Sequence, residues 1–392
     1  MSRESRTGRR THSFTESVIR EMTRVANQHG AINLAQGFPD FPAPEMLKEA
    51  ACDAIRADVN QYAITWGAPR LRRALVEKYR RHYGLEVDGE REITVTCGAT
   101  EAMAAATLAL IDPGEEVIIF EPFYENYGPD AILCGGRPVF VPTGEDGRLD
   151  LARAAVACGE RTRGLILNSP NNPTGHVCDR EELQALARVC IEHDIIAFTD
   201  EIYEHIIYGS QHIPLATVEG MRGRTVTISG FSKTFSVTGW RVGTIVAPAD
   251  LTAAIRKTHD FLTVGAPAPL QEACAVGLEE IGADYYDGLA ADYRERRDVL
   301  YDGLREAGFS CSRPAGAYYL LADFSSIRDD MDDTEFALWL AREVGVASVP
   351  GSSFYSRPGH GSRQVRFAFC KTRELLAEAG ERLRGLRGSQ SA

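Results

Sequence analysis

Short apolar runs alternate with amphipathic stretches through the middle of the chain. The runs read REITVT, EEVIIFEP, RPVFVP, GLILNSP, IIAFTD, TVTISG and GTIVAP. Several are separated by stretches with helical spacing, such as EAMAAATLALI and DREELQALARVCIEH. Short apolar strands that alternate with helices are typical of a mostly parallel sheet covered on both faces. The pattern therefore predicts an α/β fold for this part of the chain.

The pattern changes beyond residue 280. A long charged helical stretch, ADYYDGLAADYRERRDVLYDGLREAG, precedes SCSRPAGAYYLLADF, VASVPGSSFY and RQVRFAFC, which are expected to form strands of a smaller α+β unit. Near the other end, a basic arm precedes the amphipathic stretch TESVIREMTRVANQHG, which predicts a helix. We expect three parts: an N-terminal arm and helix (residues 1–45) that pack with the small domain, a large domain (46–280) and a small C-terminal domain (281–392).

Composition and charge narrow the classes of partner. Of the 392 residues, 44% are hydrophobic and 25% charged, as in ordinary soluble proteins. The net charge of −12 argues against a nucleic-acid partner, which would require a basic face. No apolar run reaches the ~18 residues of a membrane span, and the twin arginines Arg9 and Arg10 lack the apolar stretch of an export signal. We expect no membrane partner and a cytoplasmic location.

Nine cysteines are scattered along the chain. Their number is odd and no Cys-x-x-Cys pair occurs, so neither a disulfide framework nor a zinc site is indicated. No metal is expected.

Residues that can carry chemistry follow the ends of the predicted strands. In open α/β sheets, ligands bind outside the carboxyl ends of the strands. The residues expected on this edge offer backbone amides, two phenols, a side-chain amide, a carboxylate and an amine: Ala99, Thr100, Tyr124, Asn172, Asp200, Tyr203 and Lys233.

The stretch GFSKTFSVTGWRVG places one lysine, Lys233, among small and apolar residues, with Arg241 eight positions later. An ion pair between Lys233 and Asp200 would be the plain structural explanation. However, a buried amine with a depressed pKa forms Schiff bases with aldehydes. Pyridoxal phosphate requires such a lysine, a carboxylate for its ring nitrogen and a phosphate site. Amides at a helix start and the guanidinium of Arg241 suit the phosphate.

A family resemblance covers nearly the whole chain. The blocks NSPNNPTG, TDEIY and GFSKTFSVTGWRVG, together with INLAQGFPDFPAP, NQYAITWGAPRLRRAL, TCGATEAM, DPGEEVIIFEPFYENY and VRFAFCK, occur in order. In this the chain resembles the class I/II aminotransferases of fold type I, and most closely the branch with kynurenine, methionine and broad-specificity enzymes. The resemblance implies a pyridoxal 5'-phosphate cofactor bound in the large domain, an L-amino acid and a 2-oxo acid as substrates, and a homodimer.

The resemblance also assigns roles to single residues around the cofactor. Lys233 matches the Schiff-base lysine that moves the substrate's proton, and Asp200 matches the partner of the ring nitrogen. Tyr203 and Asn172 match the groups that share the cofactor's 3-oxygen, and Asn172 also helps to hold the substrate. Tyr124 matches the aromatic ring that stacks on the cofactor.

Further roles concern the phosphate and the substrate carboxylate. The amides of Ala99 and Thr100 and the side chain of Arg241 match the phosphate site. Tyr62 matches a tyrosine that reaches the phosphate of the neighbouring subunit. Arg366 matches the arginine that grips the substrate α-carboxylate, and Gly37 matches a backbone contact beside it.

One position departs from many relatives, which carry a phosphate-binding serine three residues before the lysine. Here Gly230 occupies that position, with Ser229 and Ser232 on either side. The sequence leaves open which serine, if either, contacts the phosphate.

The side chain of the donor is expected to be neutral. In the aspartate-type branch that GATEAM resembles, a lysine stands at the position of Thr100, which has no charge. Nearby blocks supply aromatic residues instead: Tyr124, Phe38, Phe41 and Trp66. Methionine or aromatic amino acids are therefore expected to be preferred. A cysteine-S-conjugate β-lyase on the same scaffold, an aspartate aminotransferase and, least favoured, a non-catalytic regulator stay open as alternatives.

Overall fold

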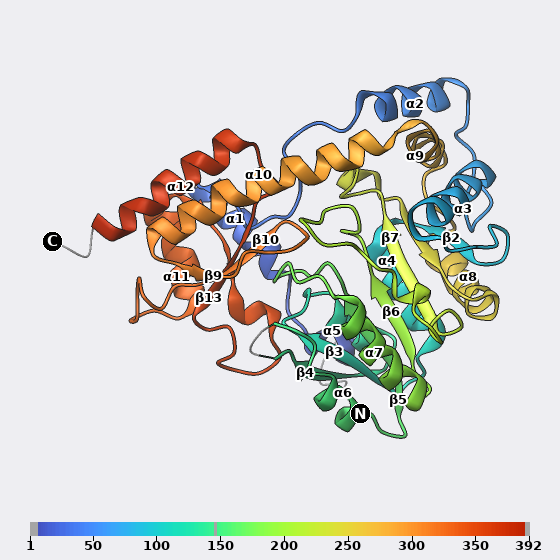
Figure 1. Cartoon of the computed structure of the whole chain (residues 1–392), viewed down its shortest axis with the longest axis horizontal. Helices are drawn as coiled ribbons and strands as arrows, with labels where there is room; N and C mark the ends of the chain where they lie inside the picture. Colours follow the sequence, from blue (N-terminus) through green and yellow to red (C-terminus); the bar gives the residue numbers. More distant parts are fainter. Residues whose placement is uncertain (1–6, 145–146, 389–392) are drawn as a thin grey trace.

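A seven-stranded sheet forms the centre of the computed structural model, which describes residues 7–144 and 147–388 (Figure 1). The strand order is β2-β8-β7-β6-β5-β3-β4. Only β8 runs against its neighbours, pairing antiparallel with β7 and β2, so the predicted mostly parallel sheet is confirmed. The strands are β2 (Ile93–Thr96), β3 (Glu116–Glu121), β4 (Arg137–Pro142), β5 (Thr162–Asn168), β6 (Ile196–Asp200), β7 (Thr225–Gly230) and β8 (Gly243–Val246).

Helices cover both faces of this sheet because its strands carry apolar side chains on both sides. In β3, Val117 and Ile119 face one layer, whereas Ile118 and Phe120 face the other. The first layer consists of α4 (Gly98–Leu110), α5 (Tyr127–Leu133) and α8 (Ala249–Thr263), and the second of α6 (Leu151–Ala157) and α7 (Arg180–Glu192). Beside β2 lies α3 (Pro69–Tyr83); α9 (Ala268–Glu280) packs on α3, and α2 (Glu45–Arg56) packs on α9 at the edge of the molecule (Figure 1).

The register of the parallel strands brings their carboxyl ends together. Asn168 at the end of β5 lies opposite Asp200 at the end of β6, and Asp200 lies opposite Ile228 of β7. The turns that follow these strands therefore start at the same edge of the sheet. Those turns carry several of the residues on which the predicted chemistry depends.

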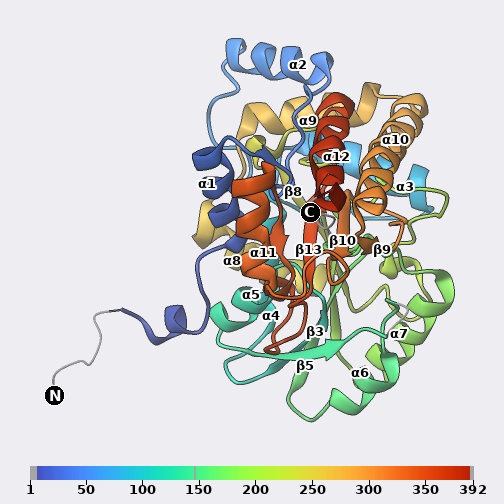
Figure 2. The same ribbon diagram turned by 90° about the vertical axis from the view of Figure 1, so that its left-hand side faces the viewer.

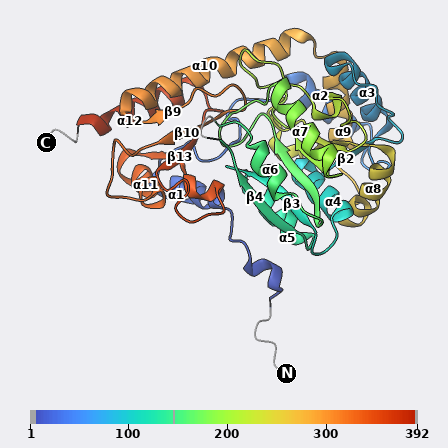
Figure 3. The same cartoon turned by 60° about the horizontal axis from the view of Figure 1, so that its bottom comes forward.

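The C-terminal part contains a four-stranded antiparallel sheet with the order β12-β13-β10-β9. Its strands are β9 (Ser310–Cys311), β10 (Tyr319–Asp323), β12 (Val349–Pro350) and β13 (Gln364–Ala368). The helices are α10 (Ala283–Ala307), α11 (Asp333–Trp339) and α12 (Arg373–Gly388); α10 reaches from beside the large sheet to the small one (Figure 3). The stretch VASVPGSSFY forms only β11 (Val346–Ala347), β12 and a 3-10 turn (Gly351–Phe354), because paired backbone is limited to two residues in each strand.

The N-terminal segment packs on this C-terminal part (Figure 2). The predicted amphipathic helix is α1 (Val18–His29), and β1 (Ile32–Asn33) pairs in parallel with β11. Ile19 and Met22 of α1 join the apolar core that includes Phe354 and Phe367. In the basic arm, Arg9–His12 form a 3-10 helix, and residues 1–6 lie outside the described residues. These contacts support the expected packing, while the boundaries at residues 45 and 280 stay a prediction.

No helix between residues 7 and 388, as far as the chain is described, has the length and apolar character to cross a bilayer.

Candidate active site

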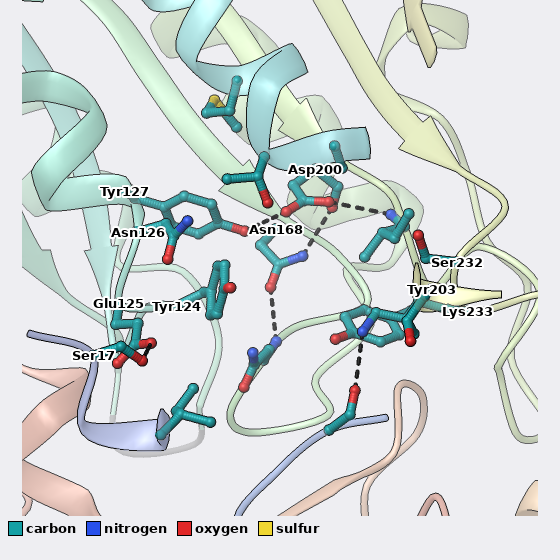
Figure 4. Close-up of a pocket in the computed structure, with 18 of the residues that line it drawn as sticks. Ser17, Tyr124, Glu125, Asn126, Tyr127, Asn168, Asp200, Tyr203, Ser232 and Lys233 are labelled. Atoms are coloured by element: carbon teal, nitrogen blue, oxygen red, sulfur yellow. Dashed lines mark hydrogen bonds between the residues drawn. The ribbon is translucent and has the colours of Figure 1, made fainter. Parts of the chain in front are cut away.

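One cavity lies at the carboxyl edge of the large sheet, where the small sheet and α1 approach it (Figure 4). Its volume is about 200 Å³. Of the residues to which the family resemblance assigns a role, all but Tyr62 line it: Gly37, Ala99, Thr100, Tyr124, Asn172, Asp200, Tyr203, Lys233, Arg241 and Arg366.

Lys233 lies on the turn after β7, and its half-buried side chain points into the cavity. Its Nζ donates a hydrogen bond of 3.1 Å to the carbonyl oxygen of Gly37, and lies 5.5 Å from the ring centre of Tyr318. Burial lowers the pKa of Lys233 to about 8, because the surrounding protein disfavours the charged form. The amine therefore loses its proton much more easily than an exposed lysine.

Asp200 is buried at the end of β6 and is held by several hydrogen bonds. The hydroxyl of Tyr127 donates to Oδ2 at 2.8 Å, and the backbone N–H of Ile202 donates to Oδ1 at 3.3 Å. Asn168 fixes the strand end by donating to the carbonyl oxygen of Asp200 at 2.9 Å. Burial raises the pKa of Asp200, and the hydrogen bond from Tyr127 acts in the opposite direction. The carboxylate is thus oriented, and within the described residues it forms no ion pair, although the charge of Lys233 also acts to lower its pKa.

Aromatic side chains form the walls around these two groups. The hydroxyls of Tyr203 and Tyr319 lie 2.9 Å apart, and burial raises the pKa of Tyr203 well above its usual value. Tyr203 is therefore a neutral phenol that can donate a hydrogen bond. Tyr124 lies edge-on to Tyr127, with 5.7 Å between ring centres. The cavity consequently offers flat apolar surface beside the lysine.

Arg366 on β13 is fully buried, which is costly for a guanidinium. Nη1 donates to the side-chain oxygen of Asn172 at 2.9 Å, and Nη2 donates to the carbonyl oxygen of Ala35 at 2.6 Å. Nε has no hydrogen-bond partner, and within residues 7–144 and 147–388 no carboxylate pairs with this arginine. A buried cation without an anion indicates that the cavity receives an anionic ligand.

The opposite end of the cavity lies at the first turn of α4, beside Arg241. Two glycines allow these segments to approach each other. A Cβ atom on Gly98 would lie 2.4 Å from Nη2 of Arg241, and one on Gly243 would lie 2.4 Å from the carbonyl carbon of Gly98. The guanidinium and the free N–H groups at the helix start form a cradle suited to a phosphate.

The two serines that flank Gly230 take different positions. Ser229 is buried, and its hydroxyl donates to Glu204, away from the cavity. Ser232 lines the cavity. Ser232 is therefore the serine placed to reach a phosphate.

Pyridoxal 5'-phosphate fits this set of groups. The cofactor presents an aldehyde, a ring nitrogen that carries a proton and a phosphate. The cavity offers an amine of lowered pKa, a buried carboxylate, and a helix start with a guanidinium. Each group of the cofactor has a counterpart of suitable charge.

Sequence reasoning missed some lining residues and misplaced others. The lining residues that were not predicted include Tyr127, Asn168, Tyr319, Ser17 at the N-cap of α1, and Ile19 and Arg20 within α1. Tyr127 and Asn168 lie within the quoted blocks FYENY and NSPNNP, so proximity to Tyr124 and Asn172 was a usable signal. Phe38, Phe41 and Trp66 were expected beside the substrate, but they lie outside the lining. Phe41 packs against Tyr293 and Arg296, and Trp66 against Arg256.

Tyr62 also lies away from the cavity of its own chain, with 86% of its surface exposed. This position neither supports nor contradicts a role at a neighbouring subunit's site.

Comparison with known proteins agrees with this site. Residues 29–383 match the family model for aminotransferase class I and II. The chain is 42% identical to a probable N-succinyldiaminopimelate aminotransferase of Mycobacterium tuberculosis, over 95% of this chain and 97% of that protein. It is 40% identical to the methionine aminotransferase of Escherichia coli (94% and 96% covered) and 36% identical to human kynurenine–oxoglutarate transaminase 1 (93% and 94% covered).

Solved structures give the same result. The N-succinyldiaminopimelate aminotransferase of Mycobacterium tuberculosis superposes with a TM-score of 0.94, covering 97% of this chain and 100% of that one at 42% identity. An aspartate aminotransferase of Thermus thermophilus with maleate has a TM-score of 0.90 at 35% identity, covering 97% and 99%. The cavity, the fold and the relatives thus agree: the chain belongs to the class I and II aminotransferases, the pyridoxal 5'-phosphate-dependent transaminases of fold type I.

Proposed function

We propose that this aminotransferase takes neutral L-amino acids, methionine and aromatic ones above all, as amino donors. The observation that carries the binding mode is the buried guanidinium of Arg366, which lacks an anion in the same cavity as Lys233. An α-amino acid carries its amine and its carboxylate on the same carbon. One molecule can therefore supply the anion that Arg366 lacks and bring an amino group to the part of the cavity that holds Lys233. The family membership supports transamination; the relatives compared above are transaminases, and nothing favours the β-lyase.

The residues of the chain divide the work between binding and proton transfer. Arg366 and Asn172 orient the substrate carboxylate, and Tyr203 and Asn172 hold the cofactor by hydrogen bonds. When bound, pyridoxal phosphate supplies an aldehyde for the amino group and a ring that withdraws electrons from the α-carbon. The amine of Lys233 then takes a proton from the α-carbon, a task for which its pKa of about 8 suits it. Asp200 would hold the cofactor's ring nitrogen in its protonated form by placing a negative charge beside it.

The wall near the substrate supports a neutral donor. Thr100 brings no charge, and Ile19, Met103 and Tyr124 present apolar surface to the cavity. One cation complicates this picture: Arg20 of α1 also lines the cavity and is exposed. Glu125 lines it as well and accepts a hydrogen bond from Ser17, so the charge of Arg20 is accompanied by an opposite one.

Methionine is expected to exceed aspartate as donor by at least about 10-fold in kcat/KM, which corresponds to roughly 1.4 kcal/mol of transition-state stabilisation. The reason is that a second carboxylate would have to be desolvated beside Thr100 without a dedicated cation. The measurement is the rate at which each of a panel of amino acids converts the bound cofactor to its amine form, followed by steady-state kinetics with one common 2-oxo acid.

The variant Arg20→Gln completes this experiment. If Arg20 plays no part in selecting the donor, the ratio between methionine and aspartate stays the same. Aspartate as the best wild-type donor, with a loss confined to aspartate in Arg20→Gln, would contradict the proposal and identify Arg20 as the second carboxylate-binding group.

We also propose that the enzyme is a homodimer in which Tyr62 serves the partner's site. Its exposed ring belongs to an apolar surface that is formed by the loop before α3 and the end of α8. A hydrogen bond of 2.8 Å, from Nε2 of His259 on α8 to the carbonyl oxygen of Thr65, holds the loop and the helix together. Val264 adopts a left-handed φ of 66°, a strained conformation for a β-branched residue. The exposed apolar residues of this surface are Tyr62, Ile64, Phe261, Leu262 and Val264.

Mixed dimers test the shared site directly. Subunits with Lys233→Ala and subunits with Tyr62→Ala are each expected to be strongly impaired. After the subunits have been unfolded and refolded together, a dimer with one of each has one site with both residues intact. Random assembly should therefore restore about a quarter of wild-type activity. Absence of any gain on mixing, although mixed dimers are detected by mass, would show that Tyr62 does not act across the interface.

A further inference from the structure

A buried carboxyl group in the active-site cavity has no part in the mechanism described above. Asp130 lies on α5, is 7% exposed and lines the same cavity as Asp200. Within the described parts of the chain, its carboxyl group has no hydrogen bond or ion pair; only its backbone groups are bonded, to Asn126 and Cys134. A buried acid without a partner is costly, so its presence calls for a reason.

None of the basic side chains in the described parts of the chain forms an ion pair with Asp130: Arg10 donates to the carbonyl oxygen of Leu133 at the end of α5 at 3.0 Å, and Arg20 lines another part of the same cavity's wall. Asp130 lies three residues after Tyr127 on the same side of the helix, and Tyr127 donates to Asp200. Helix α4 contributes the uncharged Thr100 and Met103 to this part of the cavity. The layer against β3 and β4 is apolar, with Ile119 and Phe140 beside Ala131.

Two other titratable groups are coupled to Asp130 electrostatically: Asp200 at the end of β6 and Cys134 at the end of its own helix. Burial and the charge of Asp200 together raise the pKa of Asp130 to about 7. The cavity therefore holds two nearby carboxyl groups that disfavour each other's ionisation, and their protonation steps belong to the pair.

We propose that Asp130 is a second acidic group of the cofactor site, which carries a proton in the cofactor-free enzyme and releases it to solvent when pyridoxal phosphate binds. The protonated ring nitrogen brings a positive charge to Asp200. This charge offsets the repulsion that keeps Asp130 protonated, so Asp130 ionises and adds a second negative charge that favours the protonated ring. Asp130 thus acts through Asp200: it adds negative charge near that carboxylate and takes no direct part in the reaction. The inference rests on the role proposed for Asp200.

The test is the number of protons released when pyridoxal phosphate binds to the cofactor-free protein, measured by calorimetry in buffers of different ionisation enthalpy. At pH 6 the variant Asp130→Asn should release fewer protons than wild type, by about 0.4 if binding lowers the pKa of Asp130 by about one unit. Between pH 6 and pH 8 the Kd of wild type should fall about fivefold more than that of Asp130→Asn if binding lowers the pKa of Asp130 by about one unit. Glu192→Gln, which removes an exposed carboxylate of α7, should behave as wild type.

Equal proton release and an equal pH dependence of Kd in wild type and Asp130→Asn would overturn the proposal. Should that variant fail to fold, Asp130→Leu, which suits the apolar neighbour Met103, is expected to give the same differences. Lys233 and the cofactor also exchange protons on binding, so the informative quantity is the difference between wild type and Asp130→Asn. This difference should be smaller at pH 8 than at pH 6, and a constant or rising difference would be equally decisive against the idea. A failure of the proposed donor preference would leave these binding results unchanged, so the two proposals are tested separately.

Discussion

Replacement of Lys233 with alanine is expected to reduce turnover by at least about 10⁴-fold, the upper end of what general acid–base catalysis contributes. The variant loses the amine that joins the cofactor and the base that takes the α-proton. The phosphate cradle around Arg241 and the first turn of α4 stays intact, so the protein should still hold some cofactor. Steady-state kinetics with methionine measures the loss. Treatment of wild type with borohydride, followed by peptide mapping, should place the cofactor on Lys233.

Unfolding does not explain the expected loss. The pKa of Lys233 is about 8 in the fold and 10.5 for an ordinary lysine. Because the unfolded chain binds more protons between these values, this group makes the free energy of unfolding rise with pH from about 8 to 10.5, and it is a cost to the cofactor-free fold below that range. Lys233→Ala should therefore be at least as stable as wild type at pH 7 in thermal unfolding without cofactor.

Lys257→Ala, at an exposed position of α8, is the matched control and should keep full activity. A borohydride adduct on any other lysine, or near-normal turnover in Lys233→Ala, would show that the role of Lys233 has been misassigned.

The residues at the ends of the parallel strands could be located from the sequence because one rule covers them. Strands that run in the same direction end at the same edge of the sheet. A polar residue that directly follows a predicted strand can therefore be placed at that edge from the sequence alone. Asp200, Asn172 and Lys233 follow this rule, and all three line the cavity. Locating these residues from the sequence required no knowledge of how distant segments pack.

The residues that reach the cavity from elsewhere could not be located in this way. Ile19 and Arg20 come from α1, and Tyr319 from the small sheet, whose positions against the large sheet depend on tertiary packing. Periodicity identifies a helix and its apolar face, but not which cavity the helix covers.

The misplacement of Phe41 and Trp66 has the same origin. Both lie within family blocks, INLAQGFPDFPAP and NQYAITWGAPRLRRAL, yet each packs against an arginine outside the cavity, Phe41 on Arg296 and Trp66 on Arg256. Closeness to a motif therefore indicates location only for residues on the same short turn, as for Tyr127 beside Tyr124.

Replacement of Asp200 with alanine should cost at least about 100-fold in kcat, the scale seen when a preorganised electrostatic partner is removed. The carboxylate faces the charge that develops during the reaction, so its loss should affect the transition state more than the affinity for cofactor. Asp200→Asn keeps the shape and should show a similar loss, because an amide carries no negative charge. Cofactor affinity, measured by fluorescence titration, should fall much less than kcat.

The variant Tyr127→Phe tests how much the orientation of the Asp200 carboxylate contributes to kcat, apart from its negative charge. The variant keeps the carboxylate but removes the hydrogen bond of 2.8 Å from the phenol. That bond acts against the rise in pKa that burial imposes on Asp200, so in the cofactor-free protein its loss should raise the pKa of the carboxyl group further. A hydrogen bond to a charged group is worth about 1.5–3 kcal/mol, so a loss in kcat of roughly 10-fold or more is expected, smaller than that of Asp200→Ala. Near-normal kcat in Asp200→Ala, or a larger loss in Tyr127→Phe than in Asp200→Ala, would contradict the assignment, because the phenol can act on the ring only through the carboxylate it holds.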